Sequence, residues 1–166
     1  MTYGDFVLAS GRKSSYYIDA RRTTMAGEGF ALIGSLGLSA IRANGWAPRA
    51  VGGLTLGADP VAYAIAHAAR LAGLAIDAFT VRKQAKTHGA GRRIEGCLSP
   101  GDHVVITEDV ITTGSSAREA IDAVRRAGAS VLGVLAVVDR EEGGREQIVA
   151  AGVPVATLVT VSELGV

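Results

Sequence analysis

Two adjacent carboxylates and a run of small hydroxyl residues lie close together in the chain, and their types suggest one chemistry. Glu108 and Asp109 follow the apolar residues 104–106, and small residues occupy positions 112–116. A helix pattern comes next, with apolar residues spaced to share one face: Ala117, Ala120, Ile121, Val124 and Ala127. The order of features is therefore buried strand, acidic pair, small-residue turn and helix N-terminus.

Such a turn before a helix suits a phosphate group. The first N–H groups of the helix have no partner within it, the helix dipole is positive there, and Ser115 or Ser116 is the expected cap. Glu108 and Asp109 would repel a phosphate, but carboxylates accept hydrogen bonds from sugar hydroxyls. A phosphate beside a diol indicates a ribose 5-phosphate. The alternative is an ordinary strand, turn and helix with solvated acids at the rim.

The same segment resembles a known signature. An apolar strand, two acids and a Thr/Gly/Ser loop form the 5-phosphoribosyl-1-pyrophosphate (PRPP) signature of the type I phosphoribosyltransferases, whereas neither a Walker A motif nor G-x-G-x-x-G occurs. The resemblance implies that PRPP is bound by nine consecutive residues: Glu108, Asp109, Val110, Ile111, Thr112, Thr113, Gly114, Ser115 and Ser116.

A cationic segment at residues 82–93, RKQAKTHGAGRR, is the second candidate. Most charge runs are solvated, but this density is unusual in a chain of net charge +1. Two glycines would let the segment move, and its cations could close over a pyrophosphate. The pattern R-K-x-x-K-x-H-G resembles the mobile catalytic loop of orotate phosphoribosyltransferases. That resemblance implies PRPP binding by Arg82, Lys83, Lys86 and His88, with Lys86, His88 and Asp109 as catalytic residues.

The same family resemblance extends to three further segments. The turn at Thr55, Leu56 and Gly57 precedes a helix pattern and offers free backbone donors, and in the family this junction binds pyrophosphate. Arg140 matches the arginine that pairs with the orotate carboxylate. The remaining implied orotate contacts are Thr112, Tyr16 and Tyr17, although the two tyrosines by themselves fit packing as well as stacking.

The N-terminal segment from Phe6 to Arg21 carries the family pattern F-x-L-x-S-G-x-x-S-x-Y-x-x-D-x-R. Many relatives have a lysine where this chain has Ala9, and Lys13 or Arg21 are candidates to replace that cation. Relatives usually carry an additional helix before this segment. The resemblance therefore implies a reduced hood at residues 1–24, above a core at 25–166, in a single phosphoribosyltransferase domain at 1–166.

The elements that must position these residues alternate along the chain. Apolar runs predict strands at residues 49–53, 75–81, 104–106, 130–138 and 155–161, after two short extended pieces within 6–19. Helix patterns occupy 27–45, the segment from Pro60, the segment from Ser115, and 145–152. This alternation predicts an α/β fold with a doubly wound parallel sheet and ligands at the carboxyl ends of the strands.

The composition excludes several classes of protein. Apolar residues make up 48% of 166 residues, but charges interrupt every apolar run, so we expect no transmembrane helix and no membrane partner. The N-terminus has no signal-peptide pattern, and the single cysteine, Cys97, fits a reducing cytoplasm. A net charge of +1 argues against nucleic acid as a partner.

Taken together, the resemblance implies an orotate phosphoribosyltransferase of pyrimidine (UMP) biosynthesis. It implies PRPP and orotate as substrates, Mg²⁺ as cofactor, and a homodimer whose mobile loops act on each other's active sites. Mg²⁺ would be held mostly by PRPP oxygens and water, so no residue is assigned as a metal ligand. The alternatives are a phosphoribosyltransferase for a purine or uracil, a PRPP-sensing regulator, and a paralogue that binds PRPP without catalysis.

Overall fold

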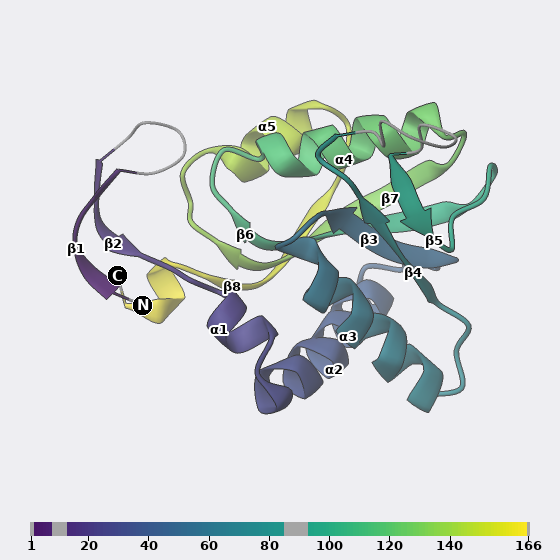
Figure 1. Cartoon of the computed structure of the whole chain (residues 1–166), viewed down its shortest axis with the longest axis horizontal. Coiled ribbons are helices and arrows are strands. Elements are labelled where there is room, and N and C mark those ends of the chain that lie inside the picture. Colours follow the sequence, from purple (N-terminus) through teal and green to yellow (C-terminus); the bar gives the residue numbers. More distant parts are fainter. Residues whose placement is uncertain (1, 8–12, 85–92, 166) are drawn as a thin grey trace.

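The structure is a computed structural model that describes residues 2–7, 13–84 and 93–165. Within these ranges the main feature is a six-stranded sheet in the order β5-β4-β3-β6-β7-β8 (Figure 1). Its strands are β3 (Ala50–Leu54), β4 (Asp77–Val81), β5 (Ile94–Gly96), β6 (His103–Ile111), β7 (Ser130–Asp139) and β8 (Val155–Thr160). All neighbouring pairs are parallel except β4 with β5. The predicted doubly wound parallel sheet is confirmed.

Helices cover both faces of this sheet. Figure 1 shows α2 (Gly27–Ala43) and α3 (Ala58–Leu71) on one face and α4 (Ser115–Arg126) and α5 (Gly144–Ala150) on the other. Alternation along β6 explains the two cores, since successive side chains of a strand point to opposite faces. Val105 packs with residues of α2 and α3, while Val104 and Ile106 pack with residues of α4.

Strand β6 is longer than the apolar run at 104–106 predicts. It continues to Ile111 because β7 pairs with it as far as Ile111 and Asp139. Glu108 and Asp109, expected at the end of the strand, therefore lie inside it, where their side chains leave the backbone on opposite sides. The turn proper begins at Thr112, as predicted.

A second, two-stranded sheet is built from β1 (Thr2–Val7) and β2 (Lys13–Tyr17), which pair antiparallel. Figure 1 shows this pair standing apart from the main sheet, at the left. Helix α1 (Arg21–Thr24) links it to α2, and a short 3₁₀ turn, η1 (Ser162–Leu164), follows β8. Three short elements, α1, β5 and η1, escaped the sequence prediction because they span too few residues to show a period.

In the described part of the chain, no helix has both the length and the apolar character that crossing a membrane requires.

Candidate active site

The turn before α4 is shaped as an anion-binding corner. Gly114 is the residue before the helix and has φ 72°, a left-handed conformation that favours glycine. The expected serine cap is wrong, because no side chain caps α4 and the Ser115 hydroxyl instead accepts a hydrogen bond from Thr113. The N–H groups of Ser115, Ser116 and Ala117 make no hydrogen bond within the described residues. These donors are therefore open to a ligand.

Helix α5 supports this corner from behind. A Cβ atom on Gly144 would lie 2.4 Å from the carbonyl oxygen of Thr112 and 2.7 Å from the nitrogen of Gly114. The backbones of the turn and of α5 are thus in direct contact, which only a glycine allows. The sequence offers no local sign of this packing, because the two glycines are separated by a whole β-α unit.

The two acids of β6 lie in different environments. Glu108 is 5% exposed, and its Oε1 atom is buried with no hydrogen-bond partner among the described residues. Burial raises the pKa of Glu108 well above its ordinary value, and the nearby charge of Asp109 raises it further. Burial also raises the pKa of Asp109, although a hydrogen bond from the Val110 N–H, at 2.8 Å, and the charge of Arg21 act against this shift.

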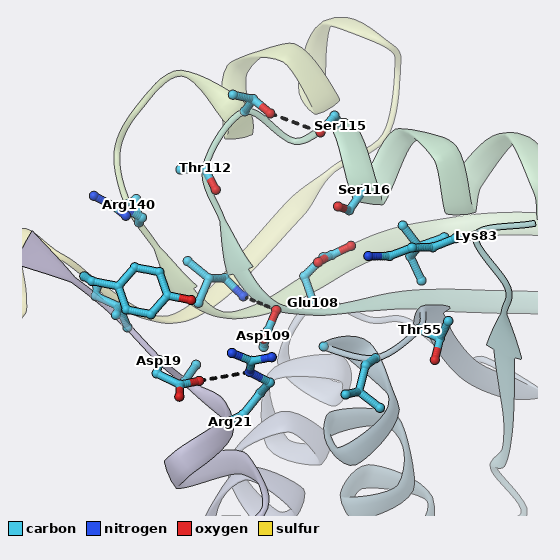
Figure 2. Close-up of a pocket in the computed structure, with 18 of the residues that line it drawn as sticks. Asp19, Arg21, Thr55, Lys83, Glu108, Asp109, Thr112, Ser115, Ser116 and Arg140 are labelled. Carbon is cyan, nitrogen blue, oxygen red and sulfur yellow. Dashed lines mark hydrogen bonds and ion pairs between the residues drawn. The ribbon is translucent and has the colours of Figure 1, made fainter. Parts of the chain in front are cut away.

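A cavity of about 610 Å³ joins the turn and both acids. It lies beyond the carboxyl ends of β3, β6 and β7, where parallel α/β sheets bind their ligands. Figure 2 shows Glu108 directed towards Ser116 and Lys83, and Asp109 directed to the other side, towards Arg21. The predicted site residues that line this cavity are Tyr17, Thr55, Leu56, Gly57, Lys83, Glu108, Asp109, Val110, Thr112, Thr113, Ser115, Ser116 and Arg140.

The turn between β3 and α3 forms the wall opposite α4. The N–H of Thr55 donates to the carbonyl oxygen of Val81 at 2.8 Å, and its hydroxyl donates to Asp59 at 2.7 Å. Both donors of Thr55 are therefore used inside the protein. The N–H groups of Leu56 and Gly57 make no hydrogen bond within the described residues and remain open. The Thr55–Leu56 peptide bond is cis.

Lys83 reaches the cavity from the end of β4, and Arg93 supports it. The Arg93 guanidinium donates to the carbonyl oxygens of Arg82, at 3.0 and 3.2 Å, and of Lys83, at 3.1 Å. It also forms an ion pair with Glu119 of α4. Figure 2 shows the Lys83 side chain directed into the cavity. Arg82 does not line the cavity and lies 3.7 Å from Glu95 instead.

Arg140 borders the cavity with most of its side chain buried. The residue is 5% exposed, its Nε atom lies 2.8 Å from Oε1 of Glu142, and its guanidinium carbon lies 4.6 Å from the ring centre of Tyr16. Tyr16 thus contacts the cavity residue Arg140 without lining the cavity itself. Stacking and ion pairing together hold the planar guanidinium in one orientation.

Asp19, which was not assigned a site role, and Arg21, which was named only as a candidate replacement for the missing lysine, also line the cavity. Asp19 accepts a hydrogen bond from Nε of Arg21 at 2.9 Å, and this contact lowers the pKa of Asp19 and raises that of Arg21. Asp19 and Arg21 are the last two defined positions of the N-terminal sequence pattern, and that pattern was the sequence signal that could have identified them.

The remaining predicted residues lie elsewhere. Ile111 and Gly114 line a small adjoining hollow of about 30 Å³ at the turn. Lys86, His88 and Ala9 lie outside the described residues.

Comparisons with known proteins assign the chain to a family. A model of the phosphoribosyl transferase domain matches residues 30–151. The orotate phosphoribosyltransferase of Aquifex aeolicus is 50% identical over 159 residues, which cover 96% of this chain and 86% of the relative. The chain belongs to the orotate phosphoribosyltransferases. The enzyme of Corynebacterium glutamicum is also 50% identical, over 99% of this chain and 87% of its own.

Solved structures of orotate phosphoribosyltransferases have the same fold. The Mycobacterium tuberculosis enzyme in complex with Fe(III) dicitrate aligns with a TM-score of 0.86 at 46% identity, covering 99% of this chain and 91% of that one. The same enzyme in complex with PRPP aligns with a TM-score of 0.83 at 43% identity, covering 97% and 90%. Enzymes of the family are pentosyltransferases and generally depend on a divalent metal ion.

Proposed function

We propose that this protein transfers the 5-phosphoribosyl group from PRPP to orotate, giving orotidine 5′-monophosphate and pyrophosphate. The observation that carries the proposal is one cavity that joins an open helix N-terminus, a buried acid pair and a buried arginine. These three features match the phosphate, the ribose diol and the planar carboxylate that the two substrates bring together. The identity of about half with orotate phosphoribosyltransferases supports the same assignment.

The 5-phosphate would lie at the turn of residues 112–116. Its oxygens can accept from the open N–H groups of Ser115, Ser116 and Ala117 and from the hydroxyls beside them. The ribose would then extend towards β6, where Glu108 and Asp109 can accept hydrogen bonds from its two hydroxyls. Oε1 of Glu108 is buried and has no hydrogen-bond partner among the described residues, which supports this role, since such an acceptor gains most from a ligand donor.

The pyrophosphate would lie between the 55–57 turn and the cationic segment. The open N–H groups of Leu56 and Gly57 supply neutral donors, and Lys83 supplies a charge directed into the cavity. Thr55 contributes to this wall through its backbone, because both of its donors are used elsewhere. Arg82, Lys86 and His88 complete the proposed set, with Lys86 and His88 acting on the leaving group.

Orotate would be recognised at Arg140. A guanidinium presents two parallel N–H donors that match a carboxylate, and the contacts with Tyr16 and Glu142 keep the group planar and oriented. Tyr17 lines the cavity and can stack on the pyrimidine, while Thr112, the first residue of the phosphate turn, lies between Arg140 and Ser115. This arrangement would favour orotate over uracil, which lacks the carboxylate.

The cavity suits Mg²⁺ bound mainly by substrate. Within the described ranges, no three His, Cys, Asp or Glu side chains are grouped so that they could hold a metal ion. Glu108 and Asp109 point to opposite sides of β6, so they do not converge on one ion. Mg²⁺ commonly keeps several waters and binds through substrate phosphates with few protein ligands. When bound, the ion would neutralise charge on the pyrophosphate.

The reaction breaks the bond between ribose C1 and the pyrophosphate oxygen, forms a bond from C1 to the orotate ring nitrogen, and releases the proton of that nitrogen to the departing pyrophosphate or to water. Positive charge builds on the ribose ring as the pyrophosphate departs. Fixed carboxylates beside the ribose stabilise that charge, and cations beside the pyrophosphate stabilise the leaving group. Glu108 and Asp109 would stabilise the charge on the ribose, and Lys83, Lys86 and His88 would stabilise the leaving pyrophosphate.

The proposal includes a division of the chain and a dimer. We propose a hood at residues 1–24 and a core at 25–166, a division supported by the separate β1-β2 sheet. We also propose a homodimer in which the segment around Lys86 acts on the partner's cavity. Arg93 fixes the end of that segment, since its guanidinium donates to the carbonyl oxygen of Lys83 and pairs with Glu119 of α4.

An assay of orotate consumption with PRPP and Mg²⁺ tests the function directly. We expect orotate and PRPP to disappear together while pyrophosphate accumulates, with no turnover when uracil or adenine replaces orotate. Binding of PRPP without turnover would instead indicate a regulator or an inactive paralogue. Turnover of uracil or adenine would indicate a different base specificity.

A further inference from the structure

Behind the 55–57 turn lies a chain of hydrogen bonds centred on a buried acid. Asp59 is 9% exposed, and both of its carboxylate oxygens accept from hydroxyls. Oδ2 accepts from Thr55 at 2.7 Å, and Oδ1 accepts from Thr80 at 2.8 Å. The Thr80 oxygen lies 3.0 Å from the hydroxyl of Tyr63. Because the Thr80 hydrogen is used on Asp59, Tyr63 is the donor in that last contact.

We propose that Asp59 is a positioning residue for pyrophosphate, an inference that rests on the proposed function. Asp59 does not line the cavity, so it acts through the residues that it holds. Thr55 begins the turn that would bind the pyrophosphate, and Thr80 lies near the end of β4, three residues before Lys83. Asp59 therefore ties together the two walls between which the pyrophosphate would lie.

The network also decides which donors face the cavity. The hydroxyl of Thr55 is held by Asp59 and its N–H by the Val81 carbonyl, so both point into the protein. The next two N–H groups belong to Leu56 and Gly57, which line the cavity, and they make no hydrogen bond within the described residues. These two donors would already be oriented before a pyrophosphate binds, so binding would not have to order them.

A carboxylate is the suitable group for this task. It can accept from two hydroxyls at once, and hydrogen bonds to a charged acceptor are stronger than neutral ones. Asp59 lies in the first turn of α3, where the helix dipole stabilises its negative charge. An amide at this position would present a donor to one of the two hydroxyls and could accept from only one.

Four variants test the inference. Thr80→Val breaks the link between the walls, Asp59→Asn removes the charge of the shared acceptor, and Thr55→Val frees the turn itself. The matched control is Thr107→Val, which removes another hydroxyl beside α3, one that donates to the carbonyl oxygen of Ala58 at 3.4 Å. Calorimetry measures the binding of inorganic pyrophosphate and, separately, of ribose 5-phosphate, and steady-state assays give the KM for PRPP and for orotate.

We expect Thr80→Val and Asp59→Asn to weaken pyrophosphate binding about tenfold, the usual scale for losing a charge-assisted hydrogen bond. Binding of ribose 5-phosphate and the orotate KM should stay at wild-type values, while the PRPP KM rises. The Thr107→Val control should match wild type. Valine fits a strand position as well as threonine does, so Thr80→Val should fold even if Asp59→Asn does not.

Two results would overturn the inference. Unchanged pyrophosphate affinity in Thr80→Val would show that the link does not position the turn. Equal losses for pyrophosphate and ribose 5-phosphate would show a general structural role. Failure of the proposed function is distinguishable, because the wild-type protein would then bind neither ligand or would not consume orotate.

Discussion

A Cβ atom on Gly57 would lie 2.5 Å from Oδ1 of Asp109. The proposed pyrophosphate turn and the second acid of β6 are thus in contact, although 52 positions separate them in the chain. The same carboxylate accepts from the N–H of Val110 at 2.8 Å, so it has little freedom to move away. The carboxylate proposed to bind the ribose therefore packs against the backbone of the turn proposed to bind the pyrophosphate.

Replacing Gly57 by alanine tests the importance of this contact. The added methyl group would displace either the turn or the Asp109 carboxylate, and overpacking of this kind costs roughly 1–3 kcal/mol. We expect Gly57→Ala to weaken PRPP binding about tenfold or more in calorimetry and to lower the melting temperature by about 2–4 °C for each kcal/mol of strain. Gly27→Ala is the control, because a Cβ atom there would meet nothing within 4 Å. Wild-type PRPP affinity in Gly57→Ala would contradict the prediction.

Glu108 should make the stability of the free protein depend on pH. Burial raises the pKa of Glu108 in the folded state, so the folded protein holds this proton more tightly than the unfolded chain does. The resulting stabilisation is complete below the ordinary glutamate pKa and is lost as the pH rises through the raised pKa. We expect the free energy of unfolding of Glu108→Gln to fall less with rising pH than that of wild type, and to be higher than wild type at neutral pH. Urea unfolding at a series of pH values measures both.

Glu146→Gln serves as the control for that series, since Glu146 is exposed on α5. Its unfolding curve should follow the wild-type pH dependence. If Glu108→Gln also runs parallel to wild type, then the buried carboxyl does not carry the predicted charge penalty.

Arg140 should determine the choice of base. Lysine keeps the charge but can neither form two parallel hydrogen bonds to a carboxylate nor stack flat on Tyr16. We expect Arg140→Lys to raise the orotate KM about tenfold or more while PRPP affinity by calorimetry stays near wild type. Efficient use of uracil by the wild-type enzyme would show that the carboxylate is not read at this position.

Lys86 should act mainly in the chemical step. If it neutralises charge only as the pyrophosphate leaves, then Lys86→Ala should lower kcat strongly with a smaller effect on PRPP affinity. Single-turnover kinetics and calorimetry separate the two quantities. An unchanged kcat would remove Lys86 from the catalytic residues.

Mixing two inactive variants should restore activity if active sites are shared. In a hybrid dimer of Lys86→Ala with Asp109→Asn, one site would carry both defects and the other neither. Random exchange of equal amounts should then recover about a quarter of wild-type activity, assuming independent sites. Demonstrated exchange without recovered activity would place Lys86 in the cavity of its own chain. Full activity of a monomer would also contradict the shared site.

Local patterns in the sequence determined the elements of this fold. The apolar run at 104–106 and the helix face from Ala117 to Val124 predicted β6 and α4, because strand and helix periods are properties of neighbouring residues. Gly128 after α4 has φ 82°, the left-handed conformation in which a glycine commonly ends a helix. The family signature likewise lies in short continuous segments. These features need no knowledge of the rest of the chain.

Only the tertiary structure decided what each side chain meets. Parallel strands need long crossover connections, so residues that touch at the carboxyl edge of the sheet lie far apart in sequence. The contact of Gly57 with Asp109, the bonds from Thr55 and Thr80 to Asp59, and the burial of Glu108 all arise in this way. A sequence pattern names the groups at the ends of the strands, but their spacing, burial and pKa depend on how β3, β4 and β6 align in the sheet.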